Sequence, residues 1–298
     1  MKRTIGAAFI CLLMLISPAQ GQMGPLTWHV SEHVSGGDGS GFDWPNAMPS
    51  LTAALAMAQG GDTIRVGQGT YHPDPGQSFV INFDLNQIKL IGGHAGWLPN
   101  GTLAPDPFQR DVQNFQTILS GDLENPVDDP FVNDLDYLRN AKLIDNADIV
   151  VMVQDVLRGT RIEGFFIERG AMNSPTGTLR GGGMYIVDSA MDVVNCTFRY
   201  NTAGIPFQIP EIPGETDPGT TSDGGGAAVL GGQMISEGVY DYTRFINCTF
   251  HDNIAGRGGA LALVDGSLEV AKVKMINCRF YDNRVIEIST AVLKPDYD

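Results

Sequence analysis

The sequence predicts an all-β fold in which short parallel strands stack in successive coils of a solenoid. Two observations support this prediction. An octapeptide occurs in nearly the same form at 194–201, 246–253 and 276–283. A glycine-rich segment precedes each copy, at 181–185, 224–228 and 258–261. Because both segments recur together, we interpret the repeating unit as a pair of short strands, which is typical of a solenoid.

Residues 1–21 have the pattern of a secretory signal peptide. A basic start is followed by an apolar run over 5–16 and by small residues at 17–19. The apolar run is too short to span a bilayer, and no later segment approaches the roughly 20 apolar residues that a span requires. We therefore expect residues 22–298 to form a single domain that is secreted or on the cell surface and does not span the membrane.

A capping segment over about 26–61 is expected to close the first coil. It contains the one convincing helix pattern, 51–59, which begins after Ser50 and ends at Gly60 and Gly61. A cap is needed because the first coil of a solenoid otherwise leaves an apolar end and a row of unpaired backbone groups open.

The coils are predicted over about 62–290. The strands expected before the octapeptides are apolar or β-branched runs that end at Gly, Pro, Asn or Asp. They lie at 63–66, 79–83, 88–91, 117–119, 149–153 and 161–167, after a first short strand at 28–33. No long helix is expected after Gln59.

Each octapeptide is interpreted as a half-buried strand. Its alternation places Ile246, Cys248 and Phe250 inward, and Asn247 and Thr249 outward. Coils that stack in register about 4.8 Å apart bring like residues together. The predicted columns are Cys196, Cys248 and Cys278, then Phe198, Phe250 and Phe280, and an amide ladder of Asn201, Asn253 and Asn283 in left-handed turns.

The three cysteines in these columns are the ones left after removal of the signal peptide. An odd number argues against a complete disulfide framework. The two-residue spacing of paired zinc ligands is also absent. We therefore expect buried thiols that act as small hydrophobic groups.

One coil is predicted to carry a protruding loop. The equivalent asparagines Asn247 and Asn277 are 30 residues apart, whereas Asn195 and Asn247 are 52 residues apart. The surplus lies at 205–222, where four prolines stand among Gly, Thr and acidic residues. Proline lacks the backbone donor that a strand ladder needs, so this stretch is expected to leave the coil.

The repeat motifs also carry a family resemblance. The Phe-x-x-Asn and Gly-Gly motifs resemble the two signature motifs of the chlamydial polymorphic outer-membrane protein repeats. The whole chain resembles bacterial right-handed parallel β-helix proteins of the pectin lyase-like superfamily, and 44–71 resembles their entry segment. The resemblance implies a right-handed parallel β-helix with a short N-terminal capping helix. It fixes no activity, because this fold hosts lyases, hydrolases and adhesins alike.

The charge of the chain argues against a nucleic-acid partner. The formal net charge is −15, and it falls to −17 when the signal peptide and its two basic residues are removed. Nucleic-acid binding needs a basic surface. Such a surface suits solubility, a basic partner or divalent cations.

An acidic segment at 122–136 is the candidate metal site. It holds six acidic residues and no base, and oxygen ligands at this density suit calcium. The candidate ligands are Asp122, Asp128, Asp129, Asp134 and Asp136. The spacing does not match an EF-hand, so a solvated loop without any cofactor is the alternative.

Catalysis would need a base beside an acidic sugar or a pair of carboxylates. The basic candidates are Arg139, Lys142, Arg158 and Arg161, and the adjacent carboxylates are Asp128 and Asp129. None of them stands in a catalytic motif, and the sequence has no nucleophile elbow. We therefore expect a structural or binding module, adhesin-like and facing extracellular carbohydrate or protein, with no catalysis. The alternative is a polysaccharide lyase or glycoside hydrolase on the same fold.

Overall fold

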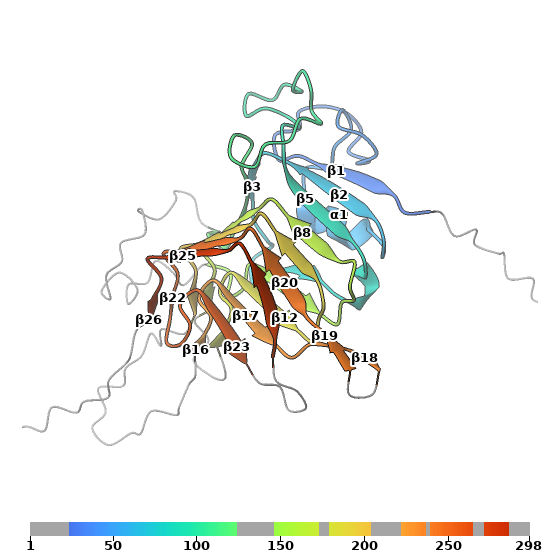
Figure 1. Ribbon diagram of the computed structural model, residues 1–298. Helices are drawn as coiled ribbons and strands as arrows, with labels where there is room; N and C mark the ends of the chain where they lie inside the picture. The colour runs from blue at the N-terminus through green and yellow to red at the C-terminus, as the bar shows by residue number, and fades with distance from the viewer. Residues whose placement is uncertain are drawn as a thin grey trace, which may run out of the picture.

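The computed structural model describes residues 24–123, 146–172, 179–203, 222–236, 239–264 and 271–285. Within these ranges the chain is almost entirely strand (Figure 1). The predicted signal peptide, the acidic segment after residue 123 and the insertion over 204–221 lie outside the described residues.

Three parallel sheets form the body of the molecule, and each runs in chain order. Sheet A consists of β1 (Thr27–Val30), β2 (Thr63–Gly67), β5 (Lys89–His94), β8 (Arg161–Glu163), β13 (Asp192–Val194), β20 (Thr243–Ile246) and β24 (Val273–Ile276). Sheet B consists of β3 (Gly69–Tyr71), β6 (Thr117–Ser120), β9 (Phe166–Glu168), β14 (Thr197–Arg199), β21 (Thr249–His251) and β25 (Arg279–Tyr281). Sheet C consists of β4 (Phe79–Ile81), β7 (Val151–Gln154), β12 (Met184–Val187), β17 (Ala227–Leu230) and β23 (Leu261–Val264).

From β2 to β23 the chain visits sheets A, B and C in turn, so each of these coils lays one strand on each sheet. Neighbouring strands of sheet A lie side by side in Figure 1, from β1 and β2 through β5 and β8 to β20. Every pairing within the three sheets is parallel. The predicted all-β parallel solenoid is therefore confirmed at this level.

Short strands complete the coils. A four-stranded sheet joins β10 (Ala171–Met172), β15 (Thr202–Ala203), β22 (Ile254–Ala255) and β26 (Arg284–Val285), and β11 (Leu179–Arg180) pairs with β16 (Ser222–Asp223). One antiparallel hairpin, β18 (Gln233–Ser236) and β19 (Val239–Asp241), projects beyond the sheets (Figure 1). Because Ser222 already belongs to β16, the predicted insertion ends at least one residue earlier than the sequence suggested.

Helix α1 (Leu51–Met57) is the predicted capping helix, two residues shorter than expected. Its first turn begins where the Ser50 hydroxyl oxygen accepts a hydrogen bond from the amide of Ala53 at 3.2 Å. Its buried residues, Leu51 among them, pack toward β1 and β4, the first strands of sheets A and C. The only other helical segment in the described residues is a 3-10 turn, Phe83–Leu85. In the part of the chain that the structure describes, no helix is long and apolar enough to cross a membrane.

The octapeptide was predicted to be one strand. The structure shows that it is a corner between two strands. In the second copy, β20 ends at Ile246, Asn247 adopts a left-handed φ of 54°, and β21 begins at Thr249. The turn breaks the alternation, so Phe245 is fully buried while Ile246 is only half-buried. The predicted inward position of Ile246 was therefore wrong, whereas Cys248 and Phe250 do lie in the core.

The same kind of corner divides another predicted strand. The expected strand at 161–167 is β8 followed by β9, because Gly164 between them has a φ of 79°. A left-handed residue turns the chain from sheet A to sheet B at this point. The prediction of two strands per coil was therefore too low. The glycine-rich segment of each repeat leads into one strand, but the octapeptide contributes to two strands, one in sheet A and one in sheet B.

The predicted columns are present in the core. The rings of Phe198 and Phe250 stack at 4.6 Å between centroids, and those of Phe250 and Phe280 at 5.0 Å. The amide of Asn201 donates to Asn253 Oδ1 at 3.0 Å, and Asn253 donates to the next ladder residue at 2.9 Å. Phe280 is 49% exposed and Cys278 half-buried, because no described strand of sheet B follows β25.

The turn conformation of the asparagine ladder differs from the prediction. The left-handed residues are those immediately before the ladder, Tyr200, Asp252 and Asp282, with φ between 53° and 58°. This leaves each ladder asparagine in an ordinary conformation with its amide directed into the stack. Asn253, for example, donates to the carbonyl of Phe198 as well as along the ladder.

Candidate functional site

The predicted calcium ligands are only partly described. Asp122 is buried, and its Oδ2 lies 3.4 Å from Nη1 of Arg169. Its other carboxylate oxygen, Oδ1, is buried and has no hydrogen-bond partner in the described part of the chain. The other four candidate ligands, Asp128, Asp129, Asp134 and Asp136, and the basic candidates Arg139 and Lys142 lie outside the described residues. Within the described ranges, no three His, Cys, Asp or Glu side chains gather in a metal-binding group.

Arg158, a basic candidate of the predicted enzyme site, lies in a charge cluster beside sheet A. It donates to Asp192 at 3.0 Å, to the Asp241 carboxylate and to the carbonyl of Tyr242 at 2.7 Å. Arg244 donates two hydrogen bonds of 2.6 Å to the carboxylate of Asp192. The hydrogen bonds from Arg158 lower the pKa of Asp241, and the bonds that Arg244 donates to Asp192 raise the pKa of Arg244.

Arg161, three residues after Arg158 at the start of β8, is held in a similar way. It pairs with Glu163 at 2.6 Å, and Arg110 donates to the same carboxylate at 2.7 Å. Burial alone would raise the pKa of Glu163, but the hydrogen bonds from the two arginines outweigh it and leave the pKa lowered. Both described candidates are therefore charge-paired, and an arginine held in this way is a poor proton acceptor.

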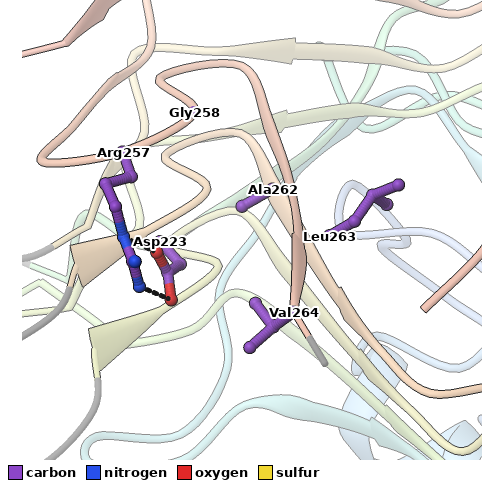
Figure 2. A pocket seen from close by; sticks show the side chains of 6 residues that line it. All are labelled: Asp223, Arg257, Gly258, Ala262, Leu263 and Val264. Carbon is purple, nitrogen blue, oxygen red and sulfur yellow. Dashed lines mark hydrogen bonds and ion pairs between the residues drawn. The ribbon is translucent and has the colours of Figure 1, made fainter. Parts of the chain in front are cut away.

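A pocket of about 370 Å³ opens at sheet C between β16 and β23 (Figure 2). Arg257 and Asp223 form one side through two hydrogen bonds, at 2.7 and 3.0 Å. Figure 2 shows this pair side by side, with Leu263 directed away from it and Gly258, Ala262 and Val264 completing the wall. Because the two charges neutralise each other, the pocket offers no unpaired charge to a ligand. No sequence motif marked this pair.

A row of polar and aromatic side chains crosses the outer face of sheet B. The register places Glu168 beside Arg199, Arg199 beside His251, and His251 beside Tyr281 on four successive strands. Tyr200 follows Arg199 at the adjoining corner. We call Glu168, Arg199, Tyr200, His251 and Tyr281 the sheet B row.

The sheet B row is ordered by contacts among its members. Glu168 accepts from Arg199 Nε at 2.5 Å, and the Arg199 guanidinium lies 5.7 Å from the ring centre of Tyr200. The His251 ring stacks on Tyr281 at 4.9 Å with an interplanar angle of 3°, and meets Tyr200 edge-on at 5.8 Å. Tyr281 is 48% exposed. A fixed guanidinium, an imidazole and a phenol ring thus follow one another on successive strands, with the two rings stacked face to face.

Two neighbours support this arrangement from below and from the side. Phe166, buried on β9, lies 4.8 Å under the Arg199 guanidinium. Asp252 lies 2.7 Å from Nδ1 of His251 and orients that ring. The sequence analysis missed the sheet B row. The sixth residue of each octapeptide carried the signal, because stacking in register places Arg199, His251 and Tyr281 in one column.

Comparisons with known proteins add little to this geometry. No protein-family model matches the chain, and no curated protein matches it. Among solved structures, it is similar to the crystal structure of pectate lyase Pel9A, at 11% sequence identity and a TM-score of 0.28, with 89% of this chain and 79% of that chain covered. We draw no functional argument from a likeness of this strength.

Proposed function

We propose that this chain is a secreted or cell-surface binding module on a right-handed parallel β-helix of the pectin lyase-like type, and that the sheet B row binds linear carbohydrate. The signal-like segment at 1–21 supports export. The strong preference of parallel strand connections for the right hand, in about 98% of cases, supports this hand for the helix. The repeat motifs support the relation to polymorphic outer-membrane protein repeats.

The observation that carries the proposed binding role is the stacking of His251 on Tyr281 across two coils. Aromatic rings combine a large apolar face with polar edges, and such rings are enriched where proteins bind ligands. A sugar ring likewise has an apolar face and a hydroxyl rim. Tyr281, which is 48% exposed at the end of this stack, therefore offers a ring to a sugar, and the Arg199 guanidinium offers hydrogen-bond donors to hydroxyl groups.

The repeat spacing favours a polymer over a single sugar. Successive members of the sheet B row stand on strands about 4.8 Å apart along the solenoid axis. A linear chain laid along this axis meets a guanidinium, an imidazole and a phenol ring in turn. Weak contacts then add up, because linked binding events raise the overall affinity without a new kind of contact.

The test is a binding titration of the purified protein with a linear neutral glucan and a linear polyuronate. Tyr281→Ala and His251→Ala should each weaken binding by roughly tenfold, which corresponds to about 1.4 kcal/mol. Phe83→Ala is the matched control, because Phe83 is an aromatic residue 65% exposed outside sheet B. Equal loss in the control, or no binding of either polymer by the wild type, would remove this function.

The alternative, a polysaccharide lyase or glycoside hydrolase on the same fold, predicts turnover in the same samples. A lyase would release unsaturated uronate products, and a hydrolase would release reducing ends. The described arginines Arg158, Arg161 and Arg244 are all held by carboxylates, which favours binding over proton abstraction. Product release in proportion to enzyme concentration would replace the binding proposal.

A further inference from the structure

The described cysteines form a column that the proposed binding role does not use. Cys196, Cys248 and Cys278 occupy the same corner of three successive coils, between a strand of sheet A and a strand of sheet B. All three are free thiols. They differ in access, because Cys196 and Cys248 are buried whereas Cys278 is half-buried.

The backbone fixes Cys248 and Cys278 opposite each other. On one side Ile246 pairs with Ile276, and on the other Thr249 pairs with Arg279. The carbonyl of Cys248 accepts the Arg279 amide at 2.9 Å. Partners in neighbouring parallel strands lie about 4.8 Å apart. This separation falls within the 4.4–6.8 Å range of Cα distances found in disulfides.

The two thiols also lie in equivalent surroundings. The Cys248 thiol donates to the carbonyl of Val193 at 3.4 Å, and the Cys278 thiol donates to the carbonyl of Phe245 at 3.4 Å. The interaction between the two neighbouring thiols lowers the pKa of Cys278 and raises that of Cys248. Burial raises the pKa of Cys196, to about 11. Cys278 is therefore the thiol that most readily forms a thiolate, and it is also the most accessible of the three. A thiolate is the form that attacks a disulfide.

We propose that Cys248 and Cys278 are an oxidation site at which an intramolecular disulfide ties two successive coils together. The oxidant is a disulfide, either a small one such as oxidised glutathione or that of a thiol-disulfide oxidoreductase. The Cys278 thiolate attacks one sulfur of the oxidant, forms a mixed disulfide and expels a first thiolate. Cys248 then attacks Cys278 Sγ, loses its proton to the second leaving thiolate, and completes the new S–S bond. The two protein thiols lose two electrons and two protons, and the oxidant disulfide becomes two thiols.

The column contains its own control. Cys196 and Cys248 are also on neighbouring coils in register, since Val194 pairs with Ile246 and Thr197 with Thr249. Coil spacing alone therefore does not choose between the two possible pairs. Solvent access decides which pair is oxidised, because an oxidant reaches Cys278 at the half-buried end of the column and does not reach the buried Cys196.

The experiment is non-reducing tryptic mapping of the full chain after oxidation with oxidised glutathione and alkylation of the remaining thiols. Trypsin places the three cysteines in separate peptides, 181–199, 245–257 and 275–279. The expected result is a disulfide between 245–257 and 275–279, with 181–199 alkylated. A bond that includes 181–199, a dimer joined through two copies of 275–279, or complete alkylation of all three peptides would overturn the proposal.

Two variants test the order of the steps. Cys248→Ser should retain glutathione on Cys278, because the resolving thiol is gone. Cys196→Ser should form the disulfide as the wild type does. Loss of the bond in a folded Cys196→Ser variant, or glutathione on Cys196 in folded Cys248→Ser, would contradict the assigned roles. The map of the wild-type chain decides the proposal even if either variant fails to fold.

Discussion

At the scale of single residues, the corners of each coil are set by left-handed backbone conformations. Asn195, Asn247 and Asn277 adopt φ between 51° and 54° where sheet A turns into sheet B. Asparagine tolerates this region better than most residues do. These asparagines also bond along the stack, since Asn277 Nδ2 donates to Asn247 Oδ1 at 2.9 Å. The residue that makes the turn thus also holds neighbouring turns in register.

The stacked phenylalanines give a prediction about stability. Phe250 is fully buried between two stacked rings, so Phe250→Ala should lower the free energy of unfolding by about 3 to 5 kcal/mol. Phe280→Ala is the matched control, because its ring is 49% exposed and should cost roughly 1 to 2 kcal/mol. Denaturant titration measures both values. Equal losses of unfolding free energy in the two variants would show that burial between stacked rings does not add to the stability contributed by Phe250.

His94 gives a prediction about pH. Burial against Trp44 and, to a smaller extent, the charges of Arg110 and Arg65 lower the pKa of His94 to about 4, although the hydrogen bond to the carbonyl of Phe108 acts in the opposite direction. Below pH 6.5 the unfolded chain holds a proton on this residue that the folded chain lacks. Stability should therefore fall as the pH drops from about 6.5 to about 4, by up to roughly 3 kcal/mol.

The measurement is thermal or denaturant unfolding across this pH range, with His94→Gln as the control variant. The glutamine variant should lose most of the slope, leaving the contribution of His29, whose pKa burial also lowers. An unchanged slope in the variant would assign the acid sensitivity to other groups.

At the scale of elements, connections between strands carry the features that depart from the repeat. The β18–β19 hairpin is tied back to the body through Asp241, which pairs with Arg158 of an earlier coil. The insertion ends where β16 begins, and Asp223 of that strand pairs with Arg257. Both connections are thus anchored by ion pairs whose partners are distant in sequence.

Calcium binding by the acidic segment at 122–136 stays a prediction. The buried, unpartnered Oδ1 of Asp122 supports an oxygen ligand at the first residue of this segment. Calcium that binds the folded state alone should raise the free energy of unfolding by about 2.7 kcal/mol at a hundredfold excess over Kd. Titration calorimetry and unfolding at millimolar calcium measure the effect.

Charge removal tests which acids hold the ion. Replacing Asp128 and Asp129 by Asn should abolish the calcium-dependent gain, whereas Asp74→Asn, an exposed acid outside the segment, should leave it intact. If wild-type protein shows neither heat nor a shift in unfolding, the segment is a solvated loop.

At the scale of the whole molecule, each coil is stabilised by packing against its neighbouring coils. One apolar core cluster runs from Trp28 in β1 to Phe250 in β21, with Cys278 packed partly against it. In a solenoid each coil contacts only its neighbours, so a coil flanked on both sides is held more firmly than a terminal one. The exposed rings of Phe280 and Tyr281 in β25 mark the less covered end of the described coils.

This asymmetry predicts a gradient of amide hydrogen exchange. The amides of β13 and β14 should exchange slowly, because strands lie on both sides of each. The amides of β24 and β25 should exchange faster, at rates that report opening of the last described coil. Exchange measured by mass spectrometry on matched peptides decides the point. Equal protection across these strands would indicate a single cooperative unit with no preferred opening end.

The sequence by itself determined the repeat and its chemistry. The recurring Phe, Cys and Asn positions predicted the stacked rings, the thiol column and the internal amide ladder. The structure confirms that these residues align, but it leaves Cys278 half-buried and Phe280 exposed, where burial was predicted. This success has a simple physical reason. Residues that recur at the same position of each coil must meet when parallel strands stack in register, whatever the path of the chain between them.

Only the tertiary structure decided the corners, the faces and the ion pairs. Asn247 and Gly164 turn the chain inside segments that alternate like single strands, because local periodicity cannot show a left-handed residue. Arg158 meets Asp241, 83 residues away, and the sheet B row joins four strands from separate coils. These contacts depend on which coils become neighbours and on the length of chain between them. Local sequence does not determine which coils become neighbours, because that depends on how the whole chain packs around the core.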